Sequence, residues 1–413
     1  MLLSVVLSYA GRLEVPLPDS IMDSLSGFNI TLANKEIGEF VQDWKNSDFD
    51  MFVSANGGNP DPDQYFYRTF RTGGSTNVLL HAPELARAAG YKDFANEIMS
   101  PEEFNNLSRN IIPVVIDARP FGQYSMVDID AKGGMQVIVK ELMDAGLLNG
   151  ETLTCTGETL HEQVNRLNPP TPDEDVIYTV QNPYKETGGL RLLGGNLSPE
   201  FSAVLKLAGV EGGLENNIFK GNAKVFDGEQ ELLKALDSNT DMFKNFDMIV
   251  VRYEGPFGAP GMPEMLDSTS RITALCREKN IVVGLMTDGR FSGGSVGLVI
   301  GHVGPEAAAG GAIALIESGD EIVVDLNTNE LNCTQLQQDE IRLERETRWK
   351  DLVTENDGMH PSVGDADTRL LNRMRNSAVS AVYGAGMHPN RSLWVRDPRK
   401  PQKSNFEPSN KFK

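Results

Sequence analysis

The 413-residue sequence is poor in cysteine and in basic side chains. Its cysteines, Cys155, Cys276 and Cys333, are far apart and none belongs to a C-x-x-C pair, which argues against a zinc ribbon or a local iron–sulfur motif. Such isolated cysteines are typical of reduced thiols in a cytoplasmic protein. The 38 Lys and Arg face 58 Asp and Glu, giving a net charge of −20. Because no basic stripe offsets this acidity, a nucleic-acid partner is disfavoured.

Several other signals are also missing. No stretch reaches the ~20 apolar residues of a membrane-spanning helix, so we expect no membrane partner. The apolar residues 1–10 have no basic segment before them, which favours a first β-strand or a short helix over a secretory signal. Neither a Walker A motif nor a convincing G-x-G-x-x-G follows a predicted strand, and no G-x-S-x-G surrounds Ser292. Nucleotide binding and a serine-hydrolase triad are therefore unsupported.

The chain is long enough for two or three domains. Residues 1–70 read as a divergent, irregular segment. Helices alternate with strands over 71–175, which predicts an α/β domain. The predicted helices span 78–89, a segment starting after Ser100, and 133–143, and the predicted strands span 114–116 and 152–156. Residues 168–175 hold three prolines and three acids, so they are predicted to be a linker.

Beyond this linker, short strands alternate with glycine-rich turns, a pattern typical of a barrel or sandwich with a few helices. The predicted strands span 188–195, 220–226, 248–253, 281–286, 312–316 and 321–325, with the last two as a hairpin. The predicted helices span 230–245, 262–278, 338–351 and 367–383. The fold class is therefore α/β: a truncated α/β N-terminal domain followed by a β-barrel-like domain over 176–395, with a polar, disordered tail over 396–413.

Polar residues follow two of the predicted buried strands. After 248–253, a Gly/Pro loop leads to Glu264, which can ligate Mg²⁺ or can be an ordinary acid in the first turn of a helix. After 281–286, a turn holds Asp288, Arg290 and Ser292. Gly293 and Gly294 follow, and their N–H groups can approach a ligand closely. A serine is a base only beside a positive centre such as a metal or an arginine.

Two further features each allow two interpretations. The turn Gly73-Gly-Ser-Thr-Asn77 opens a predicted helix and is either an anion site or a plain capping turn. His302 lies in an apolar segment, where a histidine is more often a core residue than a catalytic one.

Four motifs together resemble one enzyme family. They are Gly73-Gly-Ser-Thr-Asn-Val-Leu-Leu-His81, Val250-Val-Arg-Tyr-Glu-Gly-Pro256 with Pro260-Gly-Met-Pro-Glu-Met-Leu266, Thr287-Asp-Gly-Arg-Phe-Ser-Gly-Gly294, and Gly301-His302 with Pro305-Glu-Ala307. Over residues 71–385 the chain resembles the dihydroxy-acid dehydratase and 6-phosphogluconate dehydratase family. The resemblance implies a hydro-lyase that converts a 2,3-dihydroxy carboxylic acid or sugar acid to a 2-keto acid. It also implies a barrel similar to the swivelling domain of aconitase, and a homodimer or larger assembly.

By the same resemblance, Ser292 is the base that takes the proton from C2 and Glu264 is one Mg²⁺ ligand. The turn after 281–286 itself predicts that Arg290, Gly293 and Gly294 contact the substrate. Family members also use an iron–sulfur cluster, but its cysteines precede the Gly-Gly-Ser-Thr-Asn turn, and residues 1–72 here contain none. We therefore expect no cluster ligands in this chain. A truncated or weakly active dehydratase is one interpretation. The alternatives are a non-catalytic subunit or ligand-binding protein of the same fold, and an enzyme that uses Mg²⁺ and Ser292 without a cluster.

Overall fold

The computed structural model divides the chain into two compact units, residues 1–64 and 65–413, which are described separately. It describes the backbone of 2–8, 29–34 and 51–54, and residues 76, 77, 79, 80, 84, 100–118, 122–154, 156–208, 213–259, 262–291, 297–363 and 368–387. The first unit holds a parallel sheet of order β2-β1-β3, formed by Leu2–Ser8 (β1), Asn29–Asn34 (β2) and Met51–Ser54 (β3). Of the two elements expected within residues 1–10, a strand or a short helix, the structure has the strand. The irregular segment expected over 1–70 is wrong at these three strands.

The first part of the second unit holds short helices, and all of them except α8 start at a capping side chain. They are α6 (Pro101–Asn106), which continues as a π-helical turn (Leu107–Ile111), α7 (Met126–Ala131), α8 (Met135–Asp144) and α9 (Leu160–Leu167). Ser100 caps α6, with proline at the first helical position, as the sequence predicts. Ser125 and Thr159 form capping boxes with Asp128 and Glu162. Residues 79, 80 and 84 of the helix expected over 78–89 are helical, and the rest of it lies outside the described residues.

The strands predicted at 114–116 and 152–156 are not regular strands. Among their described residues only isolated bridges form, such as Ile116 with Ile177 and Leu153 with Thr159. The predicted linker is also anchored rather than loose, since the Asp173 carboxylate accepts hydrogen bonds from the N–H groups of Val176 (3.0 Å) and Ile177 (2.9 Å). Val176 and Ile177 then pack with Ile116, Ile138 and Leu142 in one small core. The domain boundary at 175 stays a prediction.

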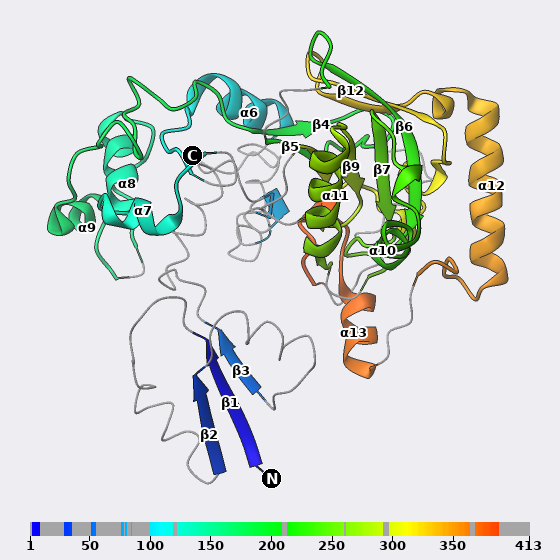
Figure 1. Ribbon diagram of the computed structural model, residues 1–413, viewed down its shortest axis with the longest axis horizontal. Coiled ribbons are helices and arrows are strands. Elements are labelled where there is room, and N and C mark those ends of the chain that lie inside the picture. The colour runs from blue at the N-terminus through cyan, green and yellow to red at the C-terminus, as the bar shows by residue number, and fades with distance from the viewer. Residues whose placement is uncertain are drawn as a thin grey trace, which may run out of the picture. The chain divides into compact units, whose positions relative to one another are not determined.

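An eight-stranded mixed sheet dominates the rest of this unit (Figure 1), in the order β13-β12-β6-β7-β9-β11-β5-β4. Its strands are β4 (Leu190–Leu193), β5 (Ala203–Ala208), β6 (Ile218–Asp227), β7 (Asp247–Arg252), β9 (Gly284–Thr287), β11 (Gly297–Gly301), β12 (Glu321–Asp325) and β13 (Glu330–Cys333). The four central strands, β6, β7, β9 and β11, are parallel, and the outer pairs are antiparallel. A bridge from Gly194 to Glu330 connects the two edges, so the sheet nearly closes and the predicted barrel is confirmed.

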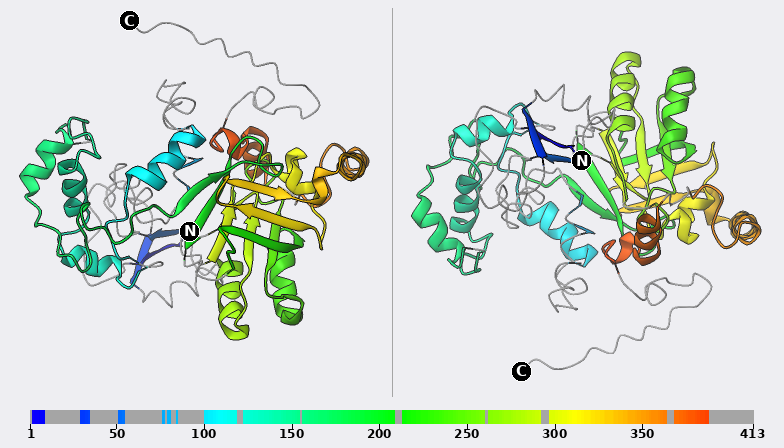
Figure 2. Two further views of the ribbon diagram at one scale, coloured as in Figure 1. Left: turned by 90° about the horizontal axis from the view of Figure 1, so that it is seen from above. Right: turned by 90° about the horizontal axis from the view of Figure 1, so that it is seen from below.

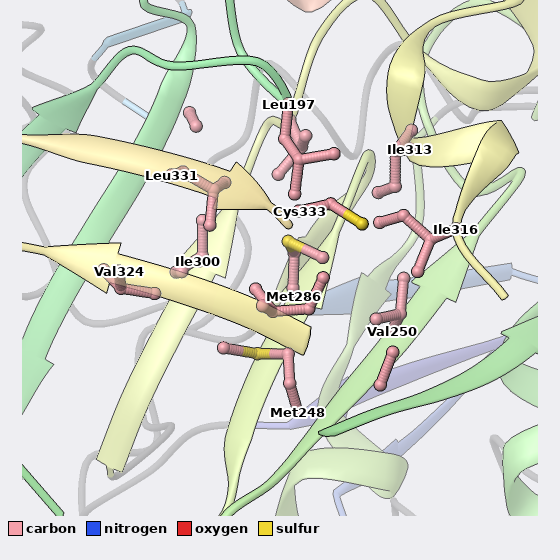
Figure 3. Packing of buried hydrophobic residues seen from close by; sticks show 14 of the residues in the cluster. Leu197, Met248, Val250, Met286, Ile300, Ile313, Ile316, Val324, Leu331 and Cys333 are labelled. Atoms are coloured by element: carbon pink, nitrogen blue, oxygen red, sulfur yellow. The ribbon is translucent and has the colours of Figure 1, made fainter. Parts of the chain in front are cut away.

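Alternate residues of the central strands point to opposite, buried faces. Met248 and Val250 of β7 point into the barrel with Met286 and Ile300 (Figure 3). Ile249 and Val251 point outward. That outer face is covered by α10 (Glu229–Ser238) and α11 (Leu266–Lys279), which lie side by side (Figure 2). Burial on both faces explains why β7 is a continuous apolar run rather than an alternating one.

Several predicted elements differ from the observed ones. Residues 312–316 form a 3₁₀ turn (Ala312–Leu315) instead of a strand, and the Arg252 guanidinium donates hydrogen bonds to the carbonyls of Ala314 and Ile316. The hairpin partner of β12 is therefore β13. Strands β5 and β11 were not predicted. The helix predicted at 230–245 ends at Ser238 and is followed by a 3₁₀ turn (Thr240–Met242).

The remaining elements follow the barrel. Helix α12 (Asp339–Glu355) confirms the charged helix, and α13 (Arg369–Ser377) ends before the predicted Tyr383. The other short elements are β8 (Glu264–Met265), β10 (Arg290–Phe291) and the 3₁₀ turns Ala307–Ala309, Gln335–Gln337 and Ala381–Tyr383. No helix in the described part of the chain is both long enough and apolar enough to cross a membrane. The tail over 396–413 lies outside the described residues.

Candidate active site

Two loops leave the carboxyl ends of the parallel strands β7 and β9 and meet beside the sheet. The first carries Glu264 into β8 and the second carries Arg290 into β10. These two short strands pair in parallel, with Glu264 opposite Arg290 and Met265 opposite Phe291. Two of the residues singled out from the sequence are therefore neighbours in space. Ser292, Gly293 and Gly294 lie outside the described residues, directly after β10.

Arg290 ties the two loops to the Gly-Gly-Ser-Thr-Asn turn. Its Nε donates a hydrogen bond to the Met262 carbonyl at 2.9 Å, and its Nη1 donates one to Asn77 Oδ1 at 3.1 Å. The Asn77 amide nitrogen lies 3.5 Å from Glu264 Oε1. Asn77 thus joins the guanidinium to the carboxylate, a role that the sequence did not predict. The predicted contact of Arg290 with a substrate stays a prediction.

His302 connects the same turn to the second loop. Its side chain is fully buried, and its Nε2 lies 3.3 Å from the Thr76 hydroxyl. Its backbone N–H donates to the Gly289 carbonyl at 2.9 Å. The residue has a φ of 58°, a left-handed conformation that costs energy for a residue with a Cβ and that recurs at functional sites. A positioning role fits these contacts, in line with the interpretation of His302 as a core residue.

Lys206 is a buried cation that sequence analysis missed. It lies on β5 opposite Val299 and is 2% exposed. Burial lowers the pKa of its ammonium group to about 8, while the negative charge of Glu264 acts in the opposite direction. The carboxylate of Glu264 is therefore in the field of Lys206 as well as beside Arg290. The only signal in the sequence was a single lysine within an apolar strand, Ala-Val-Leu-Lys-Leu-Ala.

Three carboxyl groups that are partly or fully buried lie close to the starts of the two loops. Burial raises the pKa of Asp288 to about 6 and those of Glu254 and Glu306 to about 7. Hydrogen bonds from backbone N–H groups lower each of these pKa values, but burial dominates. Shifts of this kind are common where a fold positions reactive groups.

The described residues offer an oxygen ligand but not a complete metal centre. Glu264 is exposed, and a carboxylate is the type of ligand that Mg²⁺ prefers. Within the described ranges, no group of three or more His, Cys, Asp or Glu side chains is placed to hold a metal ion. Glu264 therefore fits Mg²⁺ as one ligand. Cys276 and Cys333 do not fit an iron–sulfur cluster, since they belong to separate packing clusters on the two faces of the sheet, and Cys155 lies outside the described residues.

Two family models match the chain and identify its protein family. Residues 175–385 match the family model for the dihydroxy-acid/6-phosphogluconate dehydratase C-terminal domain. Residues 67–163 match the model for the N-terminal domain of the same family. The chain belongs to the dihydroxy-acid/6-phosphogluconate dehydratase family. The resemblance inferred from the four motifs is confirmed.

Curated members of this family are similar to the chain over much of its length. The dihydroxy-acid dehydratase of Pyrobaculum aerophilum is 45% identical over 277 residues, which are 67% of this chain and 46% of the relative. That of an Arthrobacter species is 43% identical, over 69% of this chain and 46% of the relative. That of a Nocardioides species is 39% identical, over 76% of this chain and 51% of the relative. The chain thus matches about half the length of these relatives.

Proposed function

We propose that the chain contributes the base-bearing part of a hydro-lyase that acts on 2,3-dihydroxy carboxylic acids. The observation that carries this proposal is the parallel pairing of Glu264 with Arg290, which brings two family motifs to one place and puts Ser292 two residues further along the second loop. The names of the relatives, dihydroxy-acid dehydratases, support the same reaction class. No contact described above favours the non-catalytic alternative.

In the proposed reaction, the Ser292 alkoxide takes the proton from C2 while the C3 hydroxyl leaves and is protonated to water. The product is an enol, which becomes the 2-keto acid when C3 takes up a proton and the 2-hydroxyl oxygen loses its own. A positive neighbour favours the alkoxide form of a serine, and Arg290 supplies such a charge on the same loop. Arg290 and Lys206 also compensate the negative charge of Glu264 and of an anionic substrate.

Mg²⁺ bound at Glu264 would polarise the substrate carboxylate and the 2-hydroxyl group. Glu264 would hold the ion, and Asn77 and Arg290 would hold Glu264. We derive no step through an iron–sulfur cluster, because the described cysteines do not fit one. We further propose that the protein works in the cytoplasm as a homodimer or larger assembly, without nucleic-acid or membrane partners. The family resemblance supports the assembly, and the net charge of −20 supports the absence of nucleic acid.

The test is dehydration of a panel of 2,3-dihydroxy and sugar acids by the purified chain with Mg²⁺, followed by detection of 2-keto acid. Ser292→Ala should abolish turnover and leave the fold intact. The control Ser270→Ala, at an exposed position of α11, should match the wild type. Turnover retained in Ser292→Ala would reject the role of this serine.

Glu264→Gln should raise the Mg²⁺ concentration needed for half-maximal activity, because an amide is a weaker ligand for a hard cation than a carboxylate. Glu278→Gln, on the exposed side of α11, is the matched control. An unchanged metal response in Glu264→Gln would favour the simpler interpretation of Glu264 as a helix-start residue. Iron and acid-labile sulfide analysis of the same preparation tests for a cluster directly.

A further inference from the structure

The carboxylate of Asp288 joins the two loops of the candidate site. Its Oδ2 accepts hydrogen bonds from the backbone N–H of Tyr253 at 3.0 Å and of Ala307 at 2.9 Å, and its Oδ1 accepts one from Glu254 at 3.0 Å. Tyr253 and Glu254 begin the loop that leads to Glu264. Asp288 itself begins the loop that leads to Arg290 and Ser292. One fully buried side chain therefore ties the starting points of both loops together.

Steric contact between the loops provides an independent second observation. A Cβ added at Gly289 would lie 2.7 Å from the Glu254 carbonyl oxygen and 2.9 Å from its Cβ. A Cβ added at Gly255 would lie 2.5 Å from Glu306 Cγ and 2.9 Å from the Asp288 carbonyl oxygen. These neighbours include backbone atoms, which cannot move aside as the end of a flexible side chain can. The two loops thus approach each other so closely at Gly255 and Gly289 that neither position has room for a Cβ.

We propose that Asp288 is a positioning residue that holds Glu264 and Arg290 in a fixed relation to each other. The inference rests on the proposed function for its catalytic consequence, but the coupling of the loops rests on geometry alone. Asp288 is fully buried, so it acts through the loops rather than on the substrate. Strands β8 and β10 are two residues long and cannot fix the relation by themselves.

Asp288→Asn tests the coupling because it keeps the size of the side chain while replacing one acceptor oxygen by an amide that faces N–H donors. Hydrogen–deuterium exchange measured by mass spectrometry should rise in peptides covering 253–266 and 288–301 together, by about 10- to 100-fold in the rate of local opening. Asp320→Asn is the control, since Asp320 is also a buried carboxylate but binds Arg345 and the Glu317 N–H. There the change should be confined to 317–320 and α12.

The catalytic arm measures kcat and KM separately. Misplacement of catalytic groups by about 1 Å can cost about 10²-fold in rate, so Asp288→Asn should lower kcat on that scale with little change in KM. Asp320→Asn, although destabilised, should keep its kcat, which separates positioning from a general loss of stability. Should Asp288→Asn not fold, Gly289→Ala replaces it, because the added Cβ pushes apart the same two loops.

Exchange that rises in only one loop, or a kcat equal to that of the wild type in Asp288→Asn, overturns the proposal. If the wild-type chain dehydrates none of the acids, the proposed function fails. The exchange experiment then decides the coupling by itself.

Discussion

Glu306 should make the protein less stable as the pH rises through the acidic and neutral range. Its side chain is fully buried, and burial raises its pKa from 4.5 to about 7, with nearby Asp288 acting in the same direction. The hydrogen bond from the Ala381 N–H, at 2.6 Å, opposes this shift without cancelling it. The folded state therefore binds the proton more tightly than the unfolded state does. The stability gained from this group is complete below about pH 4.5 and is lost by about pH 7.

The size of the effect follows from the two pKa values. The gap between 4.5 and about 7 corresponds to about 3 kcal/mol, since one pKa unit is worth about 1.4 kcal/mol. Glutamine is uncharged at every pH and keeps the oxygen that accepts from Ala381. Glu306→Gln should therefore be more stable than the wild type at pH 8, by up to about 3 kcal/mol, and similar to it near pH 4.

Urea unfolding followed by circular dichroism at pH 4.5, 6 and 8 measures this difference. Glu340→Gln, on the exposed surface of α12, controls for the loss of one negative charge. Part of the pH dependence should survive in Glu306→Gln, because the raised pKa values of Asp288 and Glu254 act in the same direction. The reasoning is refuted if the wild type and Glu306→Gln lose stability equally between pH 4.5 and 8.

Two further changes test other contacts of this unit. Arg290→Lys keeps the positive charge but loses the planar guanidinium that binds Met262 and Asn77 together. In steady-state assays of the panel of acids, kcat/KM should therefore fall by about 10-fold or more. An unchanged kcat/KM would show that the charge alone matters. Asp320→Asn takes from the half-buried Arg345 one of its two carboxylate partners and leaves Glu317 at 3.2 Å, so the free energy of unfolding should fall by about 1.5–3 kcal/mol in urea titrations. A loss below about 1 kcal/mol, typical of an exposed ion pair, would contradict this expectation.

The main elements of the barrel could be predicted because a local sequence pattern determines each of them. The apolar run of β7 lies between polar turns, and α12 alternates charges at helical spacing. Strand β5 escaped prediction because Lys206 interrupts its apolar pattern, and that lysine is buried between the neighbouring strands β4 and β11. Residues 312–316 read as a strand from composition alone. Their carbonyls are instead bound by Arg252, a contact 60 or more residues away in sequence.

Within the candidate site, the residue types could be predicted and their connections could not. Glu264 and Arg290 stood out because polar residues at the ends of buried strands commonly form sites. That they face each other depends on the register of β8 and β10, which no local pattern encodes. Asn77 was noted only as part of a capping or anion-binding turn. Its contacts with both residues bridge more than 180 positions of sequence, and only the folded chain brings them together.

The shortness of β8 and β10 explains why so many other contacts converge on them. A two-residue ladder contributes few hydrogen bonds, and its strands would separate readily if nothing else held them. Contacts outside the ladder hold the two strands together. Asp288 binds the start of the first loop, and Gly255 and Gly289 allow the loops to touch. At β10, the Arg290 guanidinium binds the Met262 carbonyl. The geometry of Glu264 relative to Arg290 is therefore set largely by buried groups such as Asp288. Variants of those buried groups should change the chemistry while every residue proposed to react is still present.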